Sequence, residues 1–141
     1  MITYVRPSRY LTAKKREQLY KALEIFSDEL FDGRKLPRVE VIVSVRGAGL
    51  EEHLDGVCHL EEEYDNGKPK EIVIDIRGDR GLDFAVKCLA HEFVHVWQYC
   101  TGRMEKFGLH KRNQLDYRSQ PWEIEAFELE EPLYEMWLKN S

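Results

Sequence analysis

Residues 82–102 of this 141-residue chain read LDFAVKCLAHEFVHVWQYCTG, a run in which apolar residues predominate. In a helix with this sequence, apolar side chains would cover nearly every side, which is typical of a helix in the middle of a domain. Gly102 is the expected end of that helix, because glycine readily takes the left-handed conformation that terminates helices. The remaining elements are therefore expected to pack around a central helix over residues 82–101.

Two further helices are predicted, one on each side of the central helix in the sequence. Thr12 is a suitable N-cap for a first, amphipathic helix over residues 12–31, and Gly33 follows where that helix should end. Its apolar positions recur at helical spacing, at Leu19, Leu23, Phe26 and Leu30. Pro121 suits the first turn of a last helix running to about Lys139, because proline lacks the backbone donor that this position leaves unused.

The segment between the first two helices has the pattern of β-strands. Residues 39–45 place valine at every second position, a period of two that indicates a strand. Residues 57–64 and 71–76 flank Asn66-Gly67, and Asn-Gly between extended runs predicts a hairpin. The sequence therefore predicts an α+β fold with a small, three-stranded, mostly antiparallel sheet, in a single domain covering residues 1–141.

Composition narrows the classes of protein to consider. Apolar residues make up 43% of the chain and charged residues 33%, which is ordinary for a soluble globular domain. The formal net charge is −5, whereas a dedicated nucleic-acid binder would be expected to be basic. No apolar run approaches the roughly 18 residues of a membrane span. Three cysteines, an odd number, favour reduced thiols. A cytoplasmic protein without a membrane or nucleic-acid partner is expected.

His91 and His95 stand four residues apart in the central helix, with Glu92 between them in the sequence. Residues four apart share one face of a helix, so both imidazoles would point at the same place. Zn²⁺ accepts histidine nitrogen at about 2.0–2.1 Å and lowers the pKa of water that it binds to roughly 7. Glu92 would then be placed to take a proton from that water. The structural alternative is a buried polar cluster satisfied by hydrogen bonds alone.

Two histidines leave a zinc ion short of a third protein ligand. Glu123, near the start of the last helix, is the preferred candidate, because the small Ala126 on the same helical face would let the two helices approach closely. Glu125 competes if the helical register differs by two residues. His110, 15 residues after His95, is a further candidate. Cys88, one turn before His91, is expected to be a small buried apolar residue rather than a thiolate ligand.

The motif of residues 91–95, followed by Glu123 on a downstream helix, resembles the gluzincin group of zinc metallopeptidases. Within that group, residues 82–130 look most like the small minigluzincin and ImmA/IrrE-like domains. Related peptidases often read Glu-x-x-Ala-Asp or Glu-x-x-Ala-Asn, where the last residue supports a zinc histidine; this chain has Phe127 there. SprT-like proteases, some of them associated with DNA, are the neighbouring alternative, with His110 as the third ligand.

The resemblance implies a zincin-like fold and a zinc-dependent peptidase in which His91, His95 and Glu123 bind the metal and Glu92 is the general base. It also implies a peptide or protein substrate bound as an extended strand along a sheet edge. Tyr117, Arg118 and His110 are candidates for stabilising the oxyanion. Because the chain is small, we expect its peptidase activity to be limited by a protein partner, by a narrow cleft or by low intrinsic activity. The alternative from another class is a zinc-stabilised binding or regulatory module without turnover.

Overall fold

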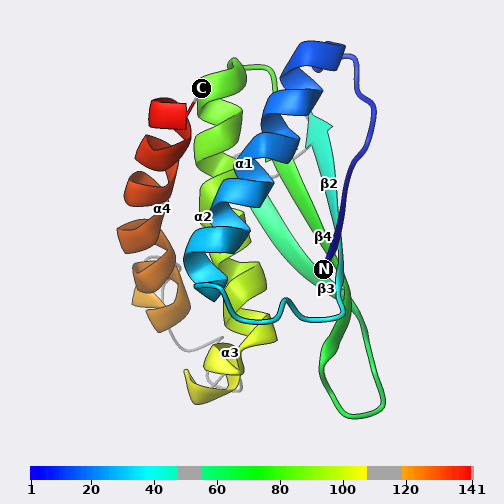
Figure 1. The fold of residues 1–141 in the computed structure, drawn as a ribbon, viewed down its shortest axis with the longest axis vertical. Coiled ribbons are helices and arrows are strands. Elements are labelled where there is room, and N and C mark those ends of the chain that lie inside the picture. Colours follow the sequence, from blue (N-terminus) through cyan, green and yellow to red (C-terminus); the bar gives the residue numbers. More distant parts are fainter. Residues whose placement is uncertain (48–54, 108–118, 141) are drawn as a thin grey trace.

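The computed structural model describes residues 1–47, 55–107 and 119–140, and its fold is α+β (Figure 1). In chain order the elements are β1 (Ile2–Val5), α1 (Ala13–Phe31), β2 (Glu40–Arg46), β3 (Gly56–Glu63), β4 (Pro69–Arg77), α2 (Leu82–Cys100), α3 (Arg103–Lys106) and α4 (Pro121–Asn140). The three long helices begin and end within a residue or two of the predicted bounds. The short helix α3 was not predicted.

The sheet differs from the prediction in both strand number and direction. It has four strands in the order β1-β2-β4-β3, in which β1, β2 and β4 are parallel and only β3 is antiparallel to its neighbour. The predicted three-stranded, mostly antiparallel sheet is therefore wrong. The missed strand, β1, has four residues, of which only Val5 is buried, so it leaves no hydrophobic pattern of its own. Helix α1 connects β1 to β2, and such a helical crossover produces parallel pairing.

The hairpin predicted at Asn66-Gly67 is confirmed. Strands β3 and β4 pair antiparallel on either side of it. Gly67 has a φ of 82°, which glycine adopts without strain, and the Asn66 side-chain oxygen accepts a hydrogen bond of 2.9 Å from the Lys68 backbone amide. The local turn chemistry thus determines this pairing.

The bounds of α1 have the expected chemical causes. The Thr12 hydroxyl accepts a hydrogen bond of 3.2 Å from the Lys15 amide, which satisfies one of the free donors of the first turn. Asp32 takes the left-handed conformation with a φ of 46°, and Gly33 follows with a φ of 71°. The predicted cap and the predicted stop are both confirmed.

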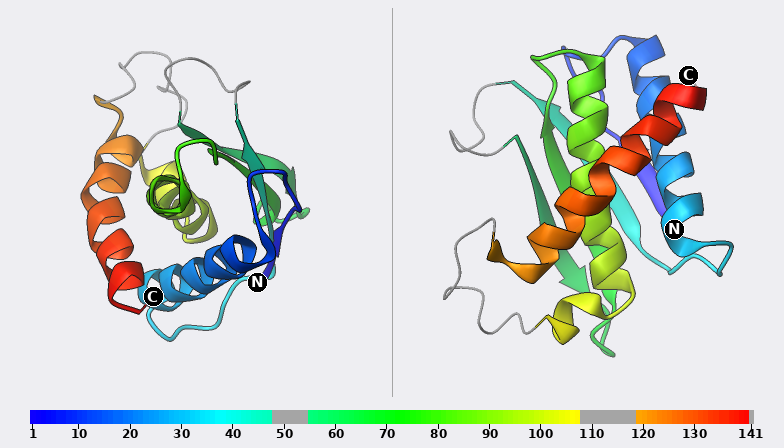
Figure 2. Two further views of the ribbon diagram at one scale, coloured as in Figure 1. Left: turned by 90° about the horizontal axis from the view of Figure 1, so that it is seen from above. Right: turned by 90° about the vertical axis from the view of Figure 1, so that its left-hand side faces the viewer.

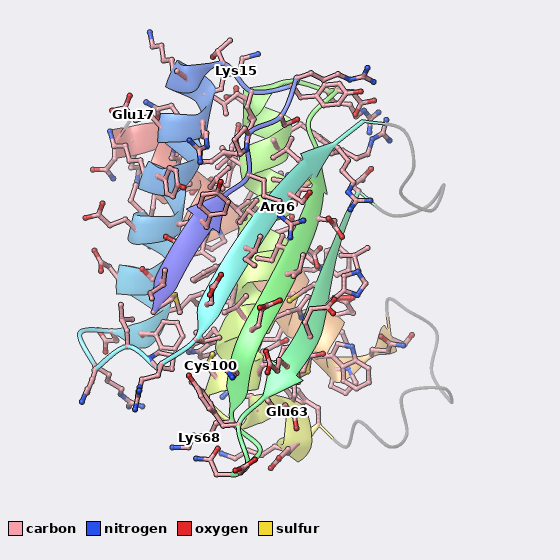
Figure 3. The ribbon with its side chains drawn as sticks, turned by 90° about the vertical axis from the view of Figure 1, so that its right-hand side faces the viewer. Arg6, Lys15, Glu17, Glu63, Lys68 and Cys100 are labelled. Carbon is pink, nitrogen blue, oxygen red and sulfur yellow. The ribbon has the colours of Figure 1, made fainter. Side chains whose placement is uncertain are left out.

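Helix α2 lies in the middle of the molecule, between the sheet, α1 and α4 (Figure 2). Eleven of its 19 residues are buried, including a continuous run from Leu89 to Val96. All three long helices lie on the same side of the sheet, with α4 packed against α2 and α1, and the strands lie in front of the helices when viewed from the opposite side (Figure 3). This arrangement puts the central motif of α2 in contact with both the sheet and α4. Within the described ranges, no helix has the length and apolar character needed to cross a bilayer.

Candidate metal centre

His91 and His95 present their imidazole rings to one point, as their spacing on α2 predicts. The ring centroids are 5.2 Å apart and the rings are nearly perpendicular, at 82°. Both residues are buried, each with 6% of its surface exposed. Two imidazoles in an apolar surrounding need polar partners, since burial of an unpaired polar group is costly.

Glu123 of α4 provides that partner. Its Oε1 atom lies 3.0 Å from His91 Nε2 and 2.5 Å from His95 Nε2. The three potential ligand atoms of His91, His95 and Glu123 all lie within 4.8 Å of one another, so the group could hold a metal ion. Ala126 is fully buried, and its methyl group lets α4 pack close to α2, as the sequence predicted. The structure thus brings together the three residues predicted as ligands.

The electrostatics of this group, in the absence of a metal, are those of a buried ion pair. Burial opposes a charge on His91, but hydrogen bonds to Glu123 and Glu130 and nearby carboxylates raise its pKa to about 10. Burial likewise opposes ionisation of Glu123, but its bonds to His91 and His95 lower its pKa to about 2. The carboxylate is thus ionised and the imidazoles hold a proton in the space that a cation would take.

Glu92 lies beside this group and faces the beginning of β3, one of the two outer strands of the sheet. It has 5% of its surface exposed, and burial, more than any charge, raises its pKa to about 7. A Cβ atom added to Gly56, the first residue of β3, would lie 3.0 Å from both Cγ and Oε2 of Glu92. The absence of a side chain at position 56 therefore makes room for the carboxylate.

The Nδ1 atoms of the two histidines have partners of their own. His95 Nδ1 lies 2.7 Å from the side-chain oxygen of Gln98, and His91 Nδ1 lies 3.5 Å from a carboxylate oxygen of Glu130. The Phe127 ring packs on His91, with 4.6 Å between ring centroids. Our sequence reasoning missed the roles of Gln98 and Glu130. Their positions carried a signal, since Gln98 is three residues after His95 and Glu130 is two turns after Glu123.

The other candidate ligands are placed elsewhere or are not described. The Glu125 carboxylate accepts hydrogen bonds from Arg103 and Gln98, and Glu125 is not part of the cluster. Burial raises the pKa of Cys88 to about 12, which keeps its thiol protonated, and Cys88 is also not part of the cluster. His110, Tyr117 and Arg118 lie outside the residues that the structure describes.

Comparisons with known proteins identify no relative. No model of a protein family matches the chain, and searches of curated proteins and of solved structures give no match either. The case for function therefore depends on the geometry and chemistry of the cluster.

The donor set and its charge fit a divalent metal such as zinc. Two histidine nitrogens and one carboxylate form a ligand set that zinc accepts in sites that keep a fourth position for water. The outer nitrogens are already engaged, by Gln98 and Glu130, which leaves both Nε2 atoms on the side of Glu123. An arrangement of this kind orients histidines for a metal.

Three glutamates of α4 provide a matched test of the ligand set. We expect Glu123→Ala to weaken zinc binding by more than the roughly 10–100-fold that loss of an outer hydrogen-bond partner costs. Glu125→Ala should have a smaller effect, and Glu128→Ala, at an exposed position, should have none. Competition with a chromogenic chelator measures each affinity. Equal affinities for the Glu123 and Glu128 variants would exclude Glu123 as a ligand.

Zinc binding should also release protons. At pH 7.5 the raised pKa of His91, about 10, means that the metal-free protein holds a proton that zinc must displace. Zinc affinity should therefore rise with pH between 6 and 9, by about tenfold per unit for each proton released. Calorimetric titrations in two buffers of different ionisation enthalpy count these protons, and identical heats in both would contradict the expectation.

Proposed function

We propose that this chain is a zinc-dependent metallopeptidase with a gluzincin-like active site in a zincin-like domain. One observation carries the proposal: the Nε2 atoms of His91 and His95 meet a carboxylate oxygen of Glu123, and Glu92 is buried beside them. Metal ligands with an adjacent carboxylate that does not bind the metal are the parts that metal-assisted hydrolysis requires.

Each residue has a distinct role in this proposal. His91, His95 and Glu123 hold the ion, which supplies Lewis-acid polarisation of a carbonyl and lowers the pKa of water. Glu92 takes a proton from the attacking water on its carboxylate and passes it to the leaving amine. Its raised pKa, about 7 in the metal-free protein, is near that of an efficient base at neutral pH.

The position of β3 supports a peptide substrate. Among the described strands, β3 pairs on one side only, with β4, so its other edge has backbone groups able to pair with an extended peptide. Because Gly56 at the start of β3 adjoins Glu92, a peptide added along this edge would pass the proposed base. We propose that the substrate binds in this way, through its backbone and with little demand on its sequence.

A zinc-stabilised module without turnover is the second candidate. The observation that favours it is burial, since His91, His95 and Glu123 expose only 6%, 6% and 3% of their surfaces. A structural zinc site has four protein ligands, whereas a catalytic site keeps a position for water.

Cobalt substitution distinguishes the two candidates. We expect the absorption of the Co²⁺-substituted protein to shift when a small anion such as azide is added, because an open position can accept an exogenous ligand. A spectrum indifferent to millimolar azide would show a closed shell and favour the module.

Glu92→Gln tests the proposed base. The variant should bind zinc with the affinity of the unaltered chain and lose about 10²–10⁴-fold or more in the hydrolysis of an internally quenched peptide library. Glu128→Gln makes the same chemical change at an exposed site of α4 and should leave both properties unchanged. Undiminished peptide cleavage by the Glu92 variant would refute the role of Glu92.

A further inference from the structure

Gln98 of α2 has a buried side chain whose hydrogen bonds connect the two helices of the metal centre. None of its surface is exposed. Its amide nitrogen donates to the Trp122 carbonyl at 2.9 Å and to a Glu125 carboxylate oxygen at 3.1 Å. Both acceptors belong to the beginning of α4, Trp122 in its first turn and Glu125 just after it, on either side of Glu123 in the sequence. A fully buried glutamine is costly unless its amide is satisfied in this way.

The two bonds of the amide nitrogen determine the orientation of the whole side chain. A backbone carbonyl and a carboxylate can only accept, so the NH₂ group must face α4. The amide oxygen then faces His95 and lies 2.7 Å from its Nδ1 atom. Since an amide oxygen can only accept, Nδ1 is the donor, and Nε2, on the side of Glu123, is the nitrogen whose lone pair a metal ion would bind.

Arg103 extends this network from the metal centre towards α3. Its guanidinium donates to both carboxylate oxygens of Glu125, with 2.9 Å between Nε and Oε1. The same group packs over the Trp97 ring, 4.7 Å from the ring centroid. Glu125 is thus held from one side by Arg103 and from the other by Gln98, so its acceptor oxygen stays where the Gln98 amide needs it.

From these contacts we infer that Gln98 is a positioning residue for the metal centre: it fixes the orientation of His95 and holds the first turn of α4, and with it Glu123, against α2. This role rests on the metal centre of the proposed function but not on peptide hydrolysis. The resemblance described above would put a supporting residue at position 127, on the glutamate helix. Here Phe127 packs on His91, and the support of His95 comes from the metal-binding helix itself.

The test compares two substitutions at position 98 with one at a matched site. Gln98→Met keeps the length of the side chain and removes its hydrogen bonds, whereas Gln98→Glu keeps an acceptor for His95 and removes both donors to α4. The control is Gln18→Met in α1, the same substitution at a site away from the metal centre. Zinc affinity is measured by chelator competition, the ligand field by Co²⁺ absorption, and the folded state by circular dichroism of the metal-free proteins.

We expect Gln98→Met to bind zinc about 10–100-fold more weakly and to shift the cobalt absorption, because His95 loses its fixed orientation. Gln98→Glu should also bind zinc more weakly, because its carboxylate cannot donate to the Trp122 carbonyl or to Glu125 and so releases the first turn of α4. Gln18→Met should match the unaltered chain in both measurements. Unchanged affinity in Gln98→Met, or weaker binding with an unchanged spectrum, would overturn the inference, since a purely structural role leaves the ligand field unaffected. Should Gln98→Met not fold, an unchanged zinc affinity in Gln98→Glu would overturn it.

The outcomes separate this inference from the proposed function. If the unaltered chain binds zinc and cleaves no peptide, the proposed peptidase activity is refuted. The role of Gln98 is then decided by the zinc affinities of the variants at position 98. A chain that cleaves peptides while Gln98→Met binds zinc normally refutes the role of Gln98 alone.

Discussion

The metal centre depends on the close packing of α4 against α2, because a carboxylate on one helix must reach two imidazoles on the other. Apolar contacts provide that packing: Ala126, Leu133 and Trp137 of α4 are all buried in the same core as α2. The polar cluster does not provide it, since removing charged groups from water costs more than their mutual attraction commonly returns. The packing therefore stabilises a cluster that the fold alone would not require. Such clusters, costly and preorganised, are typical of functional sites.

The charges of the cluster indicate which ion would offset the cost of burying its carboxylates. Glu92 and Glu123 together carry two negative charges when both are ionised, and both are almost completely buried. In the metal-free protein, protons on the histidines and the raised pKa of Glu92 reduce the imbalance. A divalent cation held by two neutral imidazoles would balance both carboxylates with no added proton. Charge neutrality inside the core thus favours an ion of charge two over a monovalent ion.

The sequence predicted the cluster well because its geometry is local within each helix. The spacing of His91 and His95 determines a shared face of α2, and Ala126 indicated which face of α4 would approach it. The strand directions were predicted less well, because parallel pairing is determined by connections between distant segments, and β1 is too short and exposed to leave a pattern. Gln98 was missed for a third reason. Its spacing from His95 was a signal for one contact, but its link to α4 includes the Trp122 carbonyl, a backbone group that the sequence does not distinguish from any other.

The mixed direction of the sheet has a consequence for the site. Helix α2 follows β4 after a short connection and runs back in the opposite direction (Figure 1). Because β3 is antiparallel to β4, it runs in the same direction as α2. Its first residue, Gly56, then meets Glu92 in the middle of α2. In a sheet with β3 between two other strands, both of its edges would be paired and no backbone group would remain for a peptide. The proposed substrate edge thus depends on the outer position of β3, and this strand order is the feature that local patterns in the sequence did not reveal.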